Sequence, residues 1–201
     1  MRFGLDARTI TEHYPGIGRY VYHLAGALAD AAPDDTLVLV LNRGQDNRRY
    51  DLAALWERPN VEIAWADARP VSAGEQVEIA WLAGRMRLDL LHSPYYVKPY
   101  ALPAPSVTTV YDITPALYPE YLPSGRARAA YELTTRLTVE TSAALVTLSE
   151  AARRDMIARF DARPDRIHVT LPAVDGRFHP RSEDEIAQTR RRLSLPESYI
   201  L

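Results

Sequence analysis

The chain has 201 residues, of which 47% are hydrophobic and 25% charged, and its formal net charge is −2. These values are ordinary for a globular protein with one large domain, or one domain plus the start of another. The near-neutral charge argues against a nucleic-acid partner. The chain contains no cysteine, which excludes disulfides, thiol nucleophiles and thiolate metal sites and fits a reducing compartment.

The amino-terminal residues MRFGLDAR have no long apolar core of the kind found in signal peptides. No apolar stretch approaches the roughly 20 residues needed to span a bilayer. We therefore expect a cytoplasmic protein, or one bound peripherally to the inner face of the membrane.

Short apolar runs alternate with helical periodicity along the whole chain. The runs predict strands at 2–6, 36–41, 60–65, 88–92, 106–111, 144–148 and 167–171. The predicted helices have apolar faces formed by Ile17, Tyr20, Val21, Leu24 and Leu28; by Val77, Ala80, Trp81, Gly84 and Leu88; by Ala130, Leu133 and Leu137; and by Ala152, Met156, Ile157 and Phe160. A capping box of Ser72 and Glu75 opens the second helix, and Ser149 caps the fourth.

The run TLVLVL at 36–41 is continuously apolar, which is typical of a strand buried on both faces. Strands that alternate with helices build a mostly parallel sheet. The fold class is therefore α/β, a Rossmann-like sheet with helices on both faces.

The carboxyl-terminal segment departs from this alternation. Residues 172–181 are predicted to form a linker, and a capping box of Ser182 and Glu185 opens a further helix. Residues 198–201 resemble the first residues of a new buried strand. We expect an amino-terminal domain at 1–175, a linker and interdomain helix at 176–197, and the start of a truncated second domain at 198–201.

Two stretches of the sequence predict ligand-binding loops. Residues 94–123 hold seven prolines and six tyrosines, in loops that follow two predicted strands. In open α/β sheets, ligands bind beyond the carboxyl ends of the strands. Residues 13–28, HYPGIGRYVYHLAGAL, place Gly16, Ile17, Gly18 and Arg19 at a helix start, where unpaired amides attract anions. Either a phosphate or a tight turn explains these glycines, and Val21 breaks the G-x-G-x-x-G pattern.

Other candidate residues also have a purely structural alternative. Asp112 either orients an acceptor hydroxyl or caps the following turn. His92 either lines the cleft or is a core histidine, and Ser149 with Glu150 either binds a ligand or only caps a helix. The histidines show no metal-ligand spacing, so no metal site is predicted.

Several segments resemble one family in their order. They are GIGRY, LLHSPYYVKPY, TTVYDITPALYPEYLP, VTLSEAARRDMIARF and RIHVTLPAVDGRFHP. Together they resemble the amino-terminal half of family 4 glycosyltransferases, which are retaining enzymes with the GT-B fold, and in particular the bacterial mannosyltransferase-like members that build polysaccharides. In that family the amino-terminal domain mainly holds the acceptor, and the other domain mainly holds the nucleotide sugar.

The resemblance implies roles for the candidate residues. The glycine loop lies in the cleft near phosphates or acceptor, and His92, Tyr95 and Tyr96 line the acceptor side. Relatives carry His-Asp at the end of the fifth strand, whereas this chain has Tyr111 before Asp112. A tyrosine can hydrogen-bond a sugar hydroxyl but does not titrate near neutral pH, which puts the usual histidine role in doubt.

The resemblance also implies the reaction. The intact enzyme would transfer a hexose, such as mannose, from a nucleotide sugar to a saccharide or lipid-linked acceptor, without a cofactor or metal, and this chain alone would be inactive. The main alternative is an inactive acceptor-binding or structural module, whose exposed interdomain surface could drive formation of a homodimer. A nucleotide or sugar-phosphate enzyme such as an epimerase ranks last, because its dinucleotide motif is absent.

Overall fold

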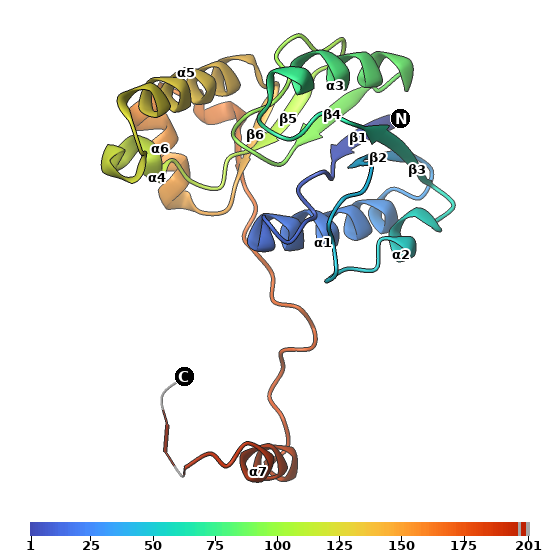
Figure 1. Ribbon diagram of the computed structural model, residues 1–201, viewed down its shortest axis with the longest axis vertical. Helices are drawn as coiled ribbons and strands as arrows, with labels where there is room; N and C mark the ends of the chain where they lie inside the picture. The colour runs from blue at the N-terminus through green and yellow to red at the C-terminus, as the bar shows by residue number, and fades with distance from the viewer. Residues whose placement is uncertain (197, 200–201) are drawn as a thin grey trace. The chain divides into compact units, whose positions relative to one another are not determined.

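The computed structural model describes residues 1–196 and 198–199. They form two compact units, Met1–Leu171 and Pro172–Leu201. The first unit is a single parallel sheet covered by helices (Figure 1). The predicted Rossmann-like α/β class is therefore confirmed.

The sheet has seven strands in the order β3-β2-β1-β4-β5-β6-β7, and every neighbouring pair is parallel. The strands are β1 Arg2–Asp6, β2 Thr36–Asn42, β3 Val61–Ala66, β4 Leu90–Ser93, β5 Ser106–Thr109, β6 Ala144–Thr147 and β7 Ile167–Val169. The helices are α1 Pro15–Ala31, α2 Ala53–Trp56, α3 Ala73–Arg85, α4 Thr114–Leu117, α5 Gly125–Thr141, α6 Glu150–Phe160 and α7 Glu183–Arg192, with short 3-10 turns at Pro119–Tyr121 and Pro164–Arg166.

Strand β2 shows why the sheet is buried on both faces. Its alternate residues Leu37, Leu39 and Leu41 pack in one hydrophobic cluster with α1, while Val38 and Val40 pack in another with α3. Successive side chains of a strand point to opposite faces, so a continuously apolar strand needs a helix layer on each side. Figure 1 shows α1 and α3 on opposite faces of this part of the sheet.

The predicted apolar face of α3 is wrong. Val77 and Trp81 are 74% and 56% exposed, and the buried residues are Glu75, Ile79, Leu82 and Ala83. Helical spacing could not separate the two faces, because apolar residues lie on both sides of this helix and an inward-facing glutamate counts as polar. Only half of the predicted capping box forms: Ser72 accepts from the Glu75 amide, but the Glu75 carboxylate contacts Arg8 and the Val71 amide instead.

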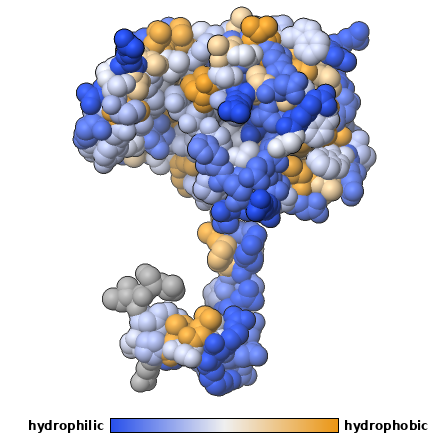
Figure 2. All heavy atoms as spheres, in the orientation of Figure 1, coloured by the Kyte–Doolittle hydropathy of each residue, from blue (hydrophilic) through white to orange (hydrophobic). Residues whose placement is uncertain are grey.

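The predicted apolar face of α5 is also wrong. Leu133 is 58% exposed, whereas Tyr131, Thr135, Thr138 and Val139 are buried. Thr138 can face inward because its Oγ1 finds an acceptor, donating to the Tyr96 carbonyl at 2.7 Å. On the face shown in Figure 2, hydrophobic residues of the first unit are scattered among hydrophilic ones.

The second unit contains α7, whose predicted capping box is confirmed. Ser182 Oγ accepts from the Glu185 amide, and the Glu185 carboxylate accepts from the Ser182 amide. The strand predicted at 198–201 falls partly outside the described residues, since these include only Ser198 and Tyr199 of it.

Candidate functional site

The strand order creates a switch point between β1 and β4. From β1 the chain proceeds through α1 to β2, and from β4 it proceeds to β5 on the opposite side. Ligands of open α/β sheets bind in the crevice that this divergence leaves at the carboxyl ends of the strands. The loop before α1 and the loop after β4 meet there, because the rings of Tyr14 and Tyr95 are in edge contact at 5.9 Å.

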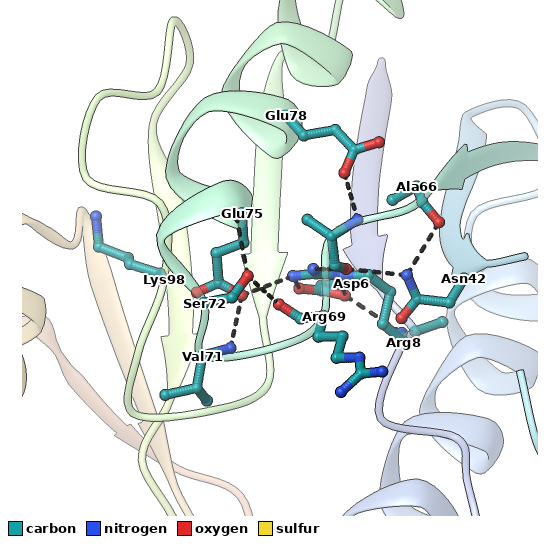
Figure 3. Close-up of polar contacts among 12 residues, drawn as sticks. Asp6, Arg8, Asn42, Ala66, Arg69, Val71, Ser72, Glu75, Glu78 and Lys98 are labelled. Carbon is teal, nitrogen blue, oxygen red and sulfur yellow. Dashed lines mark hydrogen bonds and ion pairs between the residues drawn. The ribbon is translucent and has the colours of Figure 1, made fainter.

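A buried ion cluster holds the loop that follows β1 (Figure 3). Arg8, 1% exposed, donates from Nε and Nη2 to the two carboxylate oxygens of Asp6 at 2.8 and 2.6 Å. It also donates to Glu75 Oε2 at 3.1 Å and to the Ala68 carbonyl at 2.9 Å. The cluster therefore ties the end of β1 to the loop between β3 and α3.

The charges in this cluster support one another. Burial lowers the pKa of Arg8, but its ion pair with Asp6 more than offsets this and leaves the pKa raised. Burial raises the pKa of Glu75 above its usual value. Glu75 Oε2 also accepts from the amide of Val71, whose φ of 59° is unusual for a β-branched residue. The carboxylate thus helps to hold a strained backbone turn at the start of α3.

The two glycines of the predicted phosphate loop have different environments. Gly16 is exposed, and a Cβ built on it would meet nothing within 4 Å. Gly18 is buried, and its Cβ would lie 2.9 Å from the Thr9 carbonyl oxygen. Gly18 therefore permits the close approach of α1 to the preceding loop, while Gly16 leaves the helix start open. Beside them, Ile17 packs against the core and Arg19 is exposed.

Tyrosine rings connect the loops around the switch point. Tyr95 lies against Tyr96 at 4.5 Å, and Tyr96 lies against Tyr131 of α5 at 4.8 Å. Tyr20 of α1 contacts Tyr111 beyond β5 at 5.4 Å. Burial raises the pKa of Tyr131 to about 12 and raises the pKa of Tyr111 and Tyr95 as well. These phenols stay protonated at neutral pH, so they can hydrogen-bond a ligand but cannot act as bases.

His92 is a core histidine by its geometry. It lies on β4 at 9% exposure, and its Nε2 is 2.8 Å from Thr109 Oγ1 of the neighbouring strand. Burial lowers its pKa to about 4. The imidazole is therefore neutral at physiological pH and occupied by a structural hydrogen bond. Its role in lining the cleft stays a prediction.

Asp112 and the Ser149–Glu150 pair both make structural contacts. Asp112 is exposed, and its Oδ1 accepts from the Thr114 amide at 2.8 Å. Ser149 Oγ accepts from the Ala152 amide at 3.1 Å, so it caps α6 as expected. This cap follows β6, two strands away from β4. By contrast, Tyr14 and Tyr20, which flank the glycine loop, contact the rings of Tyr95 and Tyr111. The ligand roles of Asp112, Ser149 and Glu150 stay predictions.

Sequence reasoning named Tyr111 but missed other polar groups at the carboxyl edge. Within the described residues, the hydroxyls of Thr9, Thr11, Ser93 and Tyr111 are buried without a hydrogen-bond partner. Each of them follows or ends one of the three strands β1, β4 and β5. Buried polar atoms are normally satisfied, so these hydroxyls are candidate ligand contacts. The available signal was their position directly after a buried strand, which Arg8 shares.

Two features of the structure concern metal ions and membranes. Across residues 1–196 and 198–199, no group of three or more histidine, aspartate or glutamate side chains is placed to hold a metal ion. In the same described part of the chain, no helix combines the length and the apolar character needed to cross a bilayer.

Comparison with known proteins assigns the family. The family model for Glycosyltransferase Family 4 matches residues 14–177. The chain belongs to glycosyltransferase family 4. This match includes the glycine loop, the tyrosine-rich loops and the α6 cap, and it confirms the resemblance found in the sequence.

This family 4 chain is similar to one mannosyltransferase in sequence and to other proteins in fold. It is 28% identical over 199 residues to O-antigen chain mannosyltransferase B of Escherichia coli, covering 90% of this chain and 50% of that protein. Its fold is similar to Anabaena Alr3699/HepE in complex with UDP-glucose, with TM-score 0.62 and 17% identity over 96% of this chain and 49% of that one. A glycosyltransferase from Rickettsia africae gives TM-score 0.52 at 12% identity, covering 98% and 50%. The chain thus spans about half the length of the relatives it matches, and its Rossmann-like sheet matches the fold of GT-B glycosyltransferases.

Proposed function

We propose that this chain is the acceptor-side domain of a retaining hexosyltransferase that transfers mannose or a related hexose from a nucleotide sugar to a saccharide or lipid-linked acceptor. The observation that carries the proposal is the family match over residues 14–177, and the switch point between β1 and β4, where ligands of such sheets bind, supports it. The mannosyltransferase relative supports the sugar, and a related fold that holds UDP-glucose supports the donor class.

The proposed reaction exchanges one bond at the anomeric carbon for another on the same face of the sugar. The acceptor hydroxyl oxygen forms its bond to that carbon while the bond from the carbon to the donor phosphate oxygen breaks. The acceptor proton passes to the departing phosphate oxygen. The protein then needs mainly to position the reactants and to stabilise the diphosphate charge, which amides and basic side chains can do without a metal.

Residues of this chain have distinct roles in that reaction. The exposed amides at the start of α1, where Gly16 leaves open space, are available to a phosphate oxygen. Tyr95 and Tyr96, whose rings are tilted against each other by 42°, offer aromatic surface and hydroxyls to an acceptor sugar. Asp112, exposed beyond β5, orients the acceptor hydroxyl. Tyr111 occupies the histidine position of relatives and hydrogen-bonds the sugar without exchanging its proton.

The proposal also assigns the nucleotide mainly to a second domain, so that this chain alone would be inactive. Thermal shift with a panel of nucleotide sugars compares the chain with the longer protein. A donor at about 100 times its Kd adds about 2.7 kcal/mol to stability. We expect a shift only in the longer protein; a strong shift in this chain alone would contradict the assignment.

Retention is tested by product analysis. Incubation of the longer protein with mannose and glucose donors and a saccharide acceptor should give a product whose anomeric configuration, read by NMR coupling constants, matches the donor. An inverted product would contradict the retaining mechanism, and no transfer to any saccharide or lipid-linked acceptor would contradict the transferase proposal.

A further inference from the structure

A pocket lies at the amino ends of β5, β6 and β7, whereas the switch point lies at the carboxyl ends of the strands. Its volume is about 420 Å³, and it is lined by residues that precede three strands: Ser106 at the start of β5, Ser142 and Ala143 before β6, and Arg166 before β7. Lys98, Tyr100 and Leu102 of the loop between β4 and β5 close its side. This volume is within the range of small-molecule sites.

The lining is positively charged and lacks a counter-charge. Lys98 and Arg166 both line the pocket, and no carboxylate does so within the described residues. Lys98 is 2% exposed; its Nζ has only a long contact of 3.5 Å with the Pro99 carbonyl and lies 5.3 Å from the centre of the Tyr100 ring. Figure 3 shows that its side chain points away from the Asp6–Arg8–Glu75 cluster.

The contrast with Arg8 makes Lys98 unusual. Both cations are almost completely buried, but Arg8 pairs with two carboxylates while Lys98 pairs with none among the described residues. A buried charge without a partner is costly, so proteins pair it or neutralise it. Burial lowers the pKa of Lys98 to about 8, which still leaves the amine largely protonated at pH 7.

The helix end beside the pocket does not supply the missing negative charge. Helix α5 ends at Thr141, and its last carbonyls are partial negative charges that would attract a cation. However, Thr141 Oγ1 donates to the Leu137 carbonyl at 2.6 Å, and Ser142 Oγ donates to the Thr138 carbonyl at 2.7 Å. The Thr138 carbonyl, one of the last four of the helix, is therefore occupied, and the remaining terminal carbonyls carry only partial charges.

We propose that the pocket between Lys98 and Arg166 binds a small phosphate ester, at a site separate from the transfer crevice. The lysine supplies a compact charge and the arginine a donor fork for the phosphate oxygens. Leu102, Pro105 and the Tyr100 ring supply an apolar wall for the carbon skeleton. The site lies at the amino ends of β5, β6 and β7, whereas the proposed transfer site lies at the carboxyl ends of β1, β4 and β5.

Lys98 is the only lysine of the chain, which makes the site directly observable. Acetylation with acetic anhydride followed by mass spectrometry reports the reactivity of Lys98 alone, apart from the amino terminus. The probes are inorganic phosphate and glucose 6-phosphate, with glucose as the uncharged control and chloride at matched ionic strength. We expect both phosphates to slow acetylation of Lys98 at least fivefold and glucose to have no effect.

Two substitutions distinguish phosphate binding in the pocket from a general ionic effect on the reactivity of Lys98. Arg166→Gln should raise the phosphate concentration that gives half-maximal protection of Lys98 at least tenfold. Arg163→Gln is the matched control, because Arg163 is three residues away, exposed, paired with Asp165 and outside the pocket lining. Each of three results would overturn the proposal. They are equal protection in the two variants, protection by a carboxylate such as citrate but not by phosphate, and no protection in the unsubstituted chain.

Discussion

Substitution of Gly18 by alanine should destabilise the protein, while the same substitution of Gly16 should not. A Cβ on Gly18 would lie 2.9 Å from the Thr9 carbonyl oxygen, 3.3 Å from the Ile10 Cα and 3.4 Å from the Thr11 amide nitrogen. All three atoms are backbone, so no side chain can rotate to relieve the contact. A Cβ on Gly16 meets nothing within 4 Å.

The size of the effect follows from two opposed terms. Alanine is favoured over glycine inside a helix by about 1 kcal/mol, a gain available to both variants in α1. Overpacking of a close contact costs about 1–3 kcal/mol and affects only Gly18→Ala. The two variants should therefore differ by about 2 kcal/mol, which for a protein of this size corresponds to about 4–8 °C in Tm.

Thermal and urea unfolding followed by circular dichroism measure this difference. The reasoning is refuted if Gly18→Ala melts at or above the temperature of Gly16→Ala. The same pair separates structure from function, since a larger side chain at Gly16 blocks an approaching phosphate without a steric conflict in the fold. Gly16→Val in the longer enzyme should lower the transfer rate with little change in Tm; an unchanged rate would mean that the loop is only a turn.

Three further substitutions test the remaining contacts. The pKa of His92 is about 4 in the folded protein and near 6.5 when unfolded, so the unfolded state binds the extra proton. The free energy of unfolding therefore falls by about 3 kcal/mol as pH drops from 6.5 to 4. His92→Gln should remove this pH-dependent loss, which urea unfolding at a series of pH values measures. Arg8→Met leaves the buried carboxylates of Asp6 and Glu75 without their cationic partner. The free energy of unfolding should fall by about 3–5 kcal/mol at pH 7 and by less near pH 4. An unchanged urea midpoint would contradict this. Asp112→Ala removes one turn hydrogen bond and should lower the free energy of unfolding by about 1 kcal/mol. Its transfer rate should fall by more than this loss of stability accounts for. A lowered Tm with unchanged kinetics would favour a purely structural role.

The strands and helix starts were predictable because their causes are local. The continuously apolar run of β2 predicts burial on both faces, and the structure shows a helix layer on each side. Ser149 and Ser182 cap helices as expected, since a capping side chain needs only an amide two or three residues ahead. Both ends of β1 lie where predicted, while other strand ends shifted by one or two residues, because pairing with a neighbouring strand decides where a ladder stops.

The inward faces of α3 and α5 were not predictable from periodicity. Glu75 faces inward because Arg8, 67 residues earlier, lies there to receive it. Thr138 faces inward because the Tyr96 carbonyl, 42 residues earlier, accepts its hydrogen bond. A pattern that ranks residues by hydropathy assigns such side chains to the surface, since it holds no information about a distant polar partner.

Some features of the candidate site could be predicted from the sequence, and others could not. The sequence by itself determined the family, the parallel α/β sheet and the loops that carry Gly16, Tyr95 and Asp112, because these depend on residue types in a fixed order along the chain. Only the tertiary structure decided that Gly18 makes a close backbone contact, that His92 is buried against Thr109, and that Lys98 and Arg166 line the same pocket. These relations depend on which segments pack together, and packing joins residues whose separation along the chain leaves no local pattern.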